Sequence, residues 1–301
     1  MSGASNFVQG VDLTFIIILG ISVFFLISIT AVMIYFVIRY SRKKNPKATN
    51  IEGNNTLEIV WTVIPLILVL VMFYFGWLGY RPMRQVPEGA VPIKAIGQMW
   101  SWMFEYENGK KSAELVVPLN KPVKLNLFSR DVIHSLYIPA FRIKEDVVPG
   151  KNNYMWFTAQ TEGEYDIFCA EYCGDRHSYM LSKVRVLPEA EYNSWLAQSD
   201  IPADEHPGLS LIRQNGCIAC HSLDGSKIVG PSLKGIYGHE AEVITNGLER
   251  KVAVNDEYIK RSIYEPNADV VKGYNQGLMI SYKNQLSEED IQKIIDYIKS
   301  L

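Results

Sequence analysis

The chain has 301 residues, of which 48% are hydrophobic and 21% charged, and its formal net charge is −2. This composition supplies a buried core, so it excludes wholesale disorder, and the near-neutral balance excludes a polycation that wraps nucleic acid. Charge is unevenly spread, because residues 1–90 carry seven basic and four acidic side chains whereas residues 201–301 carry eleven and fourteen. The basic excess therefore lies beside the most apolar segments, as it does in membrane proteins.

Two uncharged segments near the N-terminus are long enough to span a bilayer. Residues 13–38 and 59–80 provide 26 and 22 positions without a charge, and a helix of about 20 residues crosses the hydrocarbon core. The first segment is too long for a signal-peptide core and lacks a small-residue cleavage site. We therefore expect membrane helices over about residues 13–40 and 57–80, in preference to two buried helices of a soluble protein.

The loop between these helices is basic. Two glutamates oppose its five cations, which are Arg39, Arg42, Lys43, Lys44 and Lys47. The positive-inside rule places this loop in the cytoplasm and residues 81–301 outside. That compartment can be oxidising, so a close cysteine pair there must be a disulfide, a metal site or a thioether attachment.

From about residue 90 to residue 187 the sequence changes to short β-type runs separated by turn signals. The runs are residues 114–117, 123–128, 154–158, 164–169 and 182–186. Such short strands, with Asn-Gly and Pro-Gly turns between them, predict an antiparallel sandwich or a small barrel.

Soft metal-binding side chains gather in the last turn of this region. Cys169, Cys173, His177 and Met180 lie within twelve residues, and His134 lies 35 residues before Cys169. Two thiolates, two imidazoles and a thioether favour copper or zinc over magnesium or calcium. A mononuclear blue-copper site needs one cysteine, so the second can bridge a second metal. A Cys169–Cys173 disulfide and a zinc site that leaves Met180 unused remain alternatives.

The C-terminal region contains the run Cys217-Ile-Ala-Cys220-His221. Cys-x-x-Cys-His is the attachment motif of c-type haem, in which the histidine binds iron. A thioredoxin-like redox pair is the alternative, but the surrounding sequence has no βαβ pattern. Met279 is the only methionine after residue 180, so it is the expected second axial ligand, with His239 as a competitor.

Helical signals surround this motif. Residues 188–199 have a short helical pattern, and a linker is expected over residues 199–207. The last helix begins at a capping box formed by Ser287 and Asp290. One apolar stripe follows it, made of Ile291, Ile294, Ile295 and Ile298.

The pattern C-x-E-x-C-x-x-x-H-x-x-M, with an upstream D-V-x-H-S, resembles the dinuclear copper A site of cytochrome c oxidase subunit II. The resemblance implies two bridging thiolates, two terminal imidazoles, a weak thioether ligand and a weak backbone carbonyl ligand. The bridging thiolates would be Cys169 and Cys173, and the terminal imidazoles His134 and His177. Met180 would supply the thioether and Glu171 the backbone carbonyl. It also implies that the Glu171 side chain reaches a magnesium ion at the interface with subunit I.

Two further segments resemble the same family. Residues 100–106 match its aromatic segment, which makes Trp100 the residue between an incoming cytochrome and the copper site, although Ser101 stands where the family often has tyrosine. Residues 57–65 match the start of its second helix, which places Glu58 at the mouth of a proton path. The plainer alternatives are a core or rim aromatic for Trp100 and an interfacial carboxylate for Glu58.

The C-terminal region resembles class I cytochromes c. Residues 230–235 match the segment whose proline backbone orients the ligand histidine, which assigns that role to Pro231. Residues 277–282 are similar to the segment that carries the axial methionine, with Ile280 in place of the usual proline.

Together these features predict subunit II of a caa-type haem–copper oxidase. The expected fold is a two-helix membrane hairpin, an all-β cupredoxin-like Greek-key sandwich and an all-α cytochrome c domain. The expected boundaries are residues 1–88, 89–198, 199–207 for the linker, and 208–301. The expected setting is the bacterial cytoplasmic membrane, with both redox domains on its outer face.

The chain would pass electrons from haem c to copper A and on to subunit I, where oxygen is reduced and protons are pumped. No other histidine cluster exists here to hold the oxygen-reducing metals. Expected partners are subunit I, subunit III, a soluble cytochrome c or another donor, and lipid, but no nucleic acid. A copper A subunit of a nitric oxide reductase is the alternative, whereas a quinol oxidase subunit would lack the copper cysteines.

Overall fold

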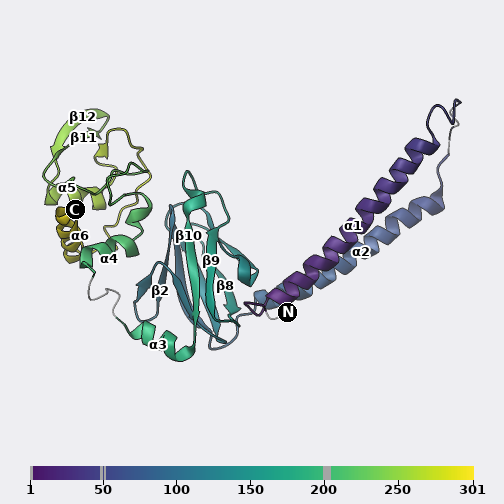
Figure 1. Cartoon of the computed structure of the whole chain (residues 1–301), viewed down its shortest axis with the longest axis horizontal. Helices are drawn as coiled ribbons and strands as arrows, with labels where there is room; N and C mark the ends of the chain where they lie inside the picture. Colours follow the sequence, from purple (N-terminus) through teal and green to yellow (C-terminus); the bar gives the residue numbers. More distant parts are fainter. Residues whose placement is uncertain (1–2, 48–49, 51, 199–204) are drawn as a thin grey trace.

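The computed structural model describes residues 3–47, 50, 52–198 and 205–301. Along the chain a helical hairpin is followed by a β-rich domain and then by a mainly helical domain, and Figure 1 shows the three in a row. Most of the expected linker, residues 199–204, lies outside the described residues.

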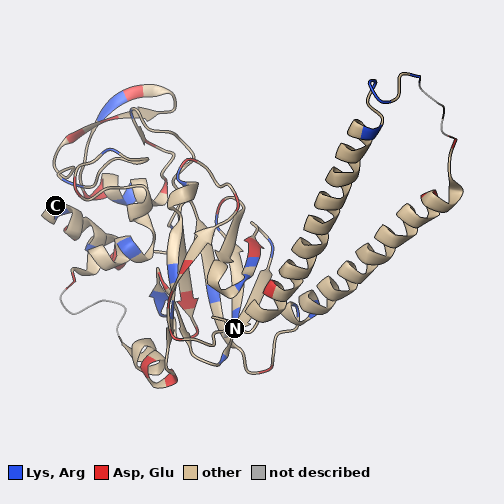
Figure 2. Ribbon diagram, turned by 45° about the vertical axis from the view of Figure 1, so that its right-hand side comes forward, with Lys and Arg blue, Asp and Glu red and all other residues tan. Residues whose placement is uncertain are grey.

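The hairpin consists of α1 (Val8–Arg39) and α2 (Asn55–Met83), both slightly longer than the sequence predicts. The Asn54 side chain caps α2 by accepting a hydrogen bond from the Leu57 amide at 3.0 Å. Both helices are long and apolar enough to cross a membrane, and their apolar side chains are largely exposed. Figure 2 shows the basic residues gathered at the far end of α1 and in the loop that follows.

The other end of the hairpin is fastened to the β-rich domain. Ahead of α1, the Ser5 hydroxyl donates to the Phe141 carbonyl at 2.8 Å, and the Phe7 ring packs edge-on against Trp156 at 5.0 Å. Just after α2, Arg84 forms an ion pair with Glu145 at 2.8 Å. Contacts from both helix ends therefore fix this domain directly at the end of the hairpin.

The β-rich domain is a sandwich of two five-stranded sheets, with strand orders β3-β2-β1-β5-β8 and β4-β10-β9-β6-β7. Its strands are β1 (Val91–Gln98), β2 (Ser101–Tyr106), β3 (Lys111–Ser112), β4 (Leu115–Pro118), β5 (Pro122–Ser129), β6 (His134–Ile138), β7 (Ile143–Val147), β8 (Asn153–Thr158), β9 (Gly163–Cys169) and β10 (Leu181–Leu187). Inward-facing residues such as Leu125, Leu136 and Ile167 are fully buried between the sheets. The five predicted strands agree with these within one residue at each end. The pairing is not wholly antiparallel as predicted, because β1 pairs with β5 and β4 with β10 in parallel.

The C-terminal domain has a second, separate core. Its helices are α4 (Pro207–Gln214), α5 (Asp256–Tyr264) and α6 (Glu288–Ser300), and α3 (Glu189–Ala197) lies between the sandwich and the linker. The predicted capping box of Ser287 and Asp290 is present, and the isoleucine stripe of α6 is buried. Ile212 of α4 packs against that stripe, which closes the core.

The C-terminal domain is not all-α as predicted, because it also contains a small three-stranded sheet. Strands β11 (Glu240–Thr245) and β12 (Leu248–Ala253) pair antiparallel, and β13 (Val270–Val271) joins β11. The turn residues Asn246 and Gly247 have positive φ angles of 50° and 81°, as a two-residue hairpin turn requires. The Asn-Gly pair was thus a hairpin signal within a region interpreted as helical.

Candidate metal and haem sites

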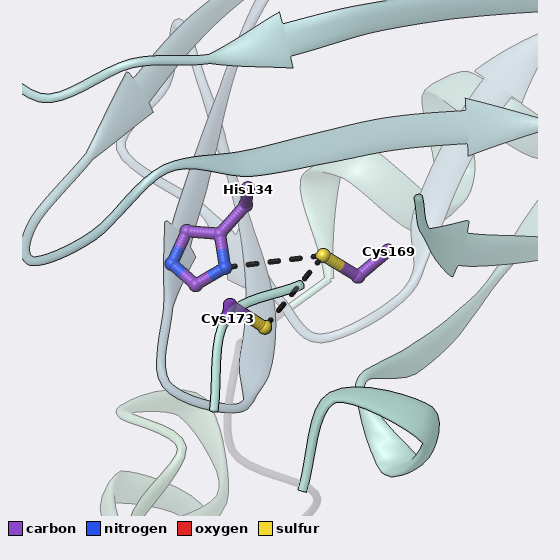
Figure 3. Close-up of side chains that lie close together, drawn as sticks. All are labelled: His134, Cys169 and Cys173. Carbon is purple, nitrogen blue, oxygen red and sulfur yellow. Dashed lines mark hydrogen bonds between the residues drawn. The ribbon is translucent and has the colours of Figure 1, made fainter. Parts of the chain in front are cut away.

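The soft side chains meet at one end of the sandwich. His134 begins β6 and Cys169 ends β9, and these two strands are hydrogen-bonded neighbours. The Cys169 amide donates to the Met180 carbonyl at 3.2 Å, which closes the loop that carries Cys173. Figure 3 shows His134 and both cysteines pointing toward one another.

Each donor atom lies within 4.0 Å of one of the two cysteine sulfurs. Cys169 Sγ is 3.8 Å from Cys173 Sγ and 4.0 Å from His134 Nδ1. Cys173 Sγ is 3.5 Å from His177 Nδ1 and 3.8 Å from Met180 Sδ. Cys169 Sγ is also 3.2 Å from the carbonyl oxygen of Glu171. The structure therefore brings together all six donors implied by the resemblance.

The chemistry of this donor set fits copper. Both cysteines are free thiols, and their sulfurs are much farther apart than the roughly 2.05 Å of a disulfide. The Met180 side chain is fully buried against Cys173, so a thioether belongs to the cluster. A thioether is a ligand for soft copper and is not used by structural zinc sites.

Asp131 fixes the orientation of His134. The ring donates from Nε2 to Asp131 Oδ1 at 2.8 Å, which leaves Nδ1 facing Cys169. The other carboxylate oxygen of Asp131 accepts from the Met99 amide at 2.7 Å. Asp131 begins the D-V-x-H-S pattern, but the pattern alone does not indicate a role for its side chain. Its position three residues before the histidine was the available signal.

The pKa values show how the cluster distributes charge. Burial favours the neutral Cys169 thiol, but hydrogen bonds from His134 and from backbone amides outweigh it and lower its pKa to about 6. Burial and the adjacent Cys169 charge raise the pKa of Cys173 to about 12. One thiolate is thus available near neutral pH, whereas the second requires a bound cation to compensate it.

Trp100 lies directly against the candidate copper ligands. Its side chain is 4% exposed, and its Nε1 donates to the Cys173 carbonyl at 3.0 Å. Gly174, the residue after Cys173, has a backbone conformation in the left-handed region. A Cβ at this position would lie 3.1 Å from the Trp100 ring. By contrast Glu58 lies in the first turn of α2, at the far end of the hairpin, and the Glu171 side chain is exposed.

The haem-attachment motif opens onto a cavity of about 400 Å³. Its walls include Cys217, Cys220, His221, Pro231 and Met279, so the expected attachment and axial residues all face one space. A cavity that collects two thiols, an imidazole and a thioether in an otherwise largely apolar wall fits a covalently held haem.

His221 is prepared to act as a ligand. Its Nδ1 is 2.8 Å from the Pro231 carbonyl, which fixes the tautomer and leaves Nε2 for a metal. Burial lowers the pKa of this imidazole, which keeps it neutral. Gly230 allows the approach, because a Cβ there would lie 2.8 Å from the ring. His239 also lines the cavity, so position alone does not separate it from Met279.

Comparison with known proteins gives matches to three family descriptions. "Cytochrome C oxidase subunit II, transmembrane domain" covers residues 1–75, "Cytochrome C oxidase subunit II, periplasmic domain" covers residues 109–187, and "Cytochrome c" covers residues 206–301. These descriptions imply copper A in the sandwich and haem c in the last domain. They agree with the expected order of a hairpin, a cupredoxin-like sandwich and a helical cytochrome c domain.

Curated relatives carry the same description. Cytochrome c oxidase subunit 2 of Alkalihalophilus pseudofirmus is 34% identical over 94% of this chain and 85% of its own length. The subunit 2 of Bacillus sp. (strain PS3) is 30% identical over 87% of this chain and 79% of its own. The solved periplasmic domain of subunit II from Bradyrhizobium japonicum is 32% identical, covers 37% of this chain and 94% of its own, and gives a TM-score of 0.36.

Proposed function

Because this chain belongs to the cytochrome c oxidase subunit II family and carries a fused cytochrome c domain, we propose that it is the electron-intake subunit of a caa-type oxidase. It works as a subunit of a haem–copper oxidase and therefore assembles with subunit I. The proposal of electron intake through haem c rests on the position of the haem cavity. Its wall includes Gln98, Met99 and Asp131 of the sandwich. When bound, haem c and copper A would supply one-electron redox chemistry at these neighbouring sites.

The residues of the copper site have distinct tasks in this proposal. Cys169 and Cys173 would hold two copper ions between them, His134 and His177 would be their terminal ligands, and Met180 would be a weak ligand. The Glu171 carbonyl would complete the set, with its side chain as the proposed magnesium ligand. Asp131 keeps Nδ1 of His134 directed at Cys169, because Nε2 is already engaged.

At the haem site Cys217 and Cys220 would attach the porphyrin, and His221 and Met279 would be the axial ligands. The Pro231 carbonyl holds His221 in the required tautomer. Trp100 would be the point at which electrons reach the copper site, since its ring bonds the backbone of Cys173. Glu58 is proposed as the mouth of a proton path in subunit I.

Domain boundaries at residues 1–88, 89–198, 199–207 and 208–301 are part of the proposal. So are a subunit III partner, a soluble cytochrome or similar donor, and a location in the bacterial cytoplasmic membrane.

The oxidase assignment is tested by purification of the tagged chain from its native membrane. We expect an oxygen-consuming complex that contains subunit I. A complex that reduces nitric oxide but not oxygen would contradict the oxidase assignment.

The basic loop predicts a specific membrane orientation. A cysteine introduced at Lys47 should react only after the membrane is permeabilised, whereas one at the exposed Glu289 should react in intact cells. Labelling with a membrane-impermeant maleimide measures both positions, and reaction of both from the same side would mean that one helix does not span.

A further inference from the structure

The turn that joins β1 to β2, residues Gln98–Ser101, lies between the copper candidates and the cytochrome c domain. Trp100 faces inward and donates to the Cys173 carbonyl. Gln98 and Met99 line the haem cavity on the opposite side. Within this four-residue turn, Trp100 contacts the proposed copper site, and Gln98 and Met99 contact the proposed haem site.

Gln98 makes the most extensive of these contacts. Its Nε2 donates to the Asn215 carbonyl at 2.8 Å and to the Tyr282 hydroxyl at 3.1 Å. Its Oε1 accepts from Arg130 Nη1 at 2.7 Å, which orients the amide. All of this is buried, since Gln98, Asn215 and Tyr282 are each about 5% exposed or less.

The two partners of Gln98 occupy informative places in the cytochrome c domain. Asn215 lies two residues before Cys217, and Tyr282 lies three residues after Met279. The Tyr282 hydroxyl also donates to the Asn215 carbonyl at 3.0 Å. The Gln98 side chain thus forms hydrogen bonds to the segment just before the haem-attachment motif and to the segment just after Met279.

A second close approach flanks this junction. Gly216 lies so near the turn that an added Cβ would overlap the Ser101 hydroxyl and lie 2.9 Å from Gln98 Nε2. Arg176, three residues after Cys173, donates to the Ala219 carbonyl at 2.7 Å. Cys220 and Val229 pack against the core of the sandwich. Small side chains at positions 101 and 216 therefore make room for the contact.

We propose that the 98–101 turn is the docking site, or seat, of the cytochrome c domain and that Gln98 is the residue that positions this domain. The inference rests on the proposed function, because the seat matters only if electrons pass between the two domains. In the seated state one electron leaves the reduced haem and one is gained by the oxidised copper pair, and no bond forms or breaks. A separate donor then delivers its electrons to the cytochrome c domain, since the turn beside Trp100 is already covered.

The test uses the full-length chain in detergent, loaded with copper and haem. Gln98→Leu removes the bonds to Asn215 and Tyr282 at similar side-chain volume, and Ser101→Tyr places a large ring where Gly216 must approach. Gln160→Leu and Ser194→Tyr make the same chemical changes at exposed positions far along the chain from the turn. Copper and haem contents equal to wild type show that a variant has folded.

Two measurements are made on each variant. Hydrogen exchange of peptides containing residues 98–101 and 282 should rise about tenfold in Gln98→Leu, the scale of one to two net hydrogen bonds. Ser101→Tyr should raise it at least as much, and the flash-initiated internal transfer rate should fall in both variants. The two control variants should match wild type in both measurements.

The outcomes separate the seat from the proposed function. Unchanged exchange and unchanged internal rate in both seat variants would overturn the seat while leaving the proposed function intact. A wild-type chain that transfers no electron internally would overturn the proposed function, whereas raised exchange in the variants would still support the seat. Raised exchange together with slowed transfer supports both.

Discussion

Replacing Cys173 by serine should abolish the dinuclear copper centre while the sandwich remains folded. Cys173 Sγ contacts three other donors, namely Cys169, His177 and Met180. A serine hydroxyl is a hard ligand and only weakly acidic, so it cannot replace a bridging thiolate. Electron paramagnetic resonance of the purified complex should lose the signal of one electron shared by two coppers, and metal analysis should find less copper per complex than in the wild type.

Tyr172→Phe is the matched control for this loop, because the Tyr172 side chain is 73% exposed beside Cys173. It should retain both coppers and the shared-electron signal. If the wild-type chain instead shows a mononuclear copper spectrum, or binds zinc in place of copper, the copper A assignment is wrong.

Replacing Met279 by alanine should leave haem covalently attached but change its sixth ligand. Attachment depends on Cys217 and Cys220, and His221 stays held by the Pro231 carbonyl. Loss of the thioether should abolish the weak near-infrared sulfur-to-iron band. It should also lower the reduction potential by a fraction of the roughly 0.8 V range that axial ligands span.

His239→Gln separates the two candidate ligands that line the cavity. We expect this variant to keep both the near-infrared band and the wild-type potential. If the wild-type chain lacks the band, and the reduction potential changes in His239→Gln but not in Met279→Ala, His239 and not Met279 is the ligand.

The clustering of the soft side chains could be predicted from the sequence because four of the five lie in one short segment. Cys169 to Met180 form a single loop, so the spacing of the motif largely determines which donors meet. The same holds for the capping box of α6, in which both partners lie within one helical turn. Local signals of this kind need no knowledge of the fold.

The contact between the domains could not be predicted in this way. Gln98 is 117 residues from Asn215 and 184 from Tyr282, and nothing in the local sequence marks it as a partner for either. Ser101 was recognised as a departure from the family pattern, but its meaning depends on Gly216 of another domain. The β11–β12 hairpin was missed for a different reason, since its Asn-Gly signal was outweighed by the expectation of a wholly helical domain.

In the proposed function, the fused cytochrome c domain is the direct electron donor to the copper site. Tethering holds the two domains at an effective concentration in the millimolar range, so charge steering is not required. The hydrogen bonds from Gln98 and Arg176 across the junction also end on uncharged acceptors. Their strength should therefore depend only weakly on salt.

The most direct test is flash reduction of the haem in the full-length chain, followed by the arrival of the electron at copper. We predict a first-order rate that is independent of protein concentration and nearly independent of ionic strength. A rate that rises with protein concentration, or that falls steeply with added salt, would contradict the account, because the electron would then be travelling between separate molecules.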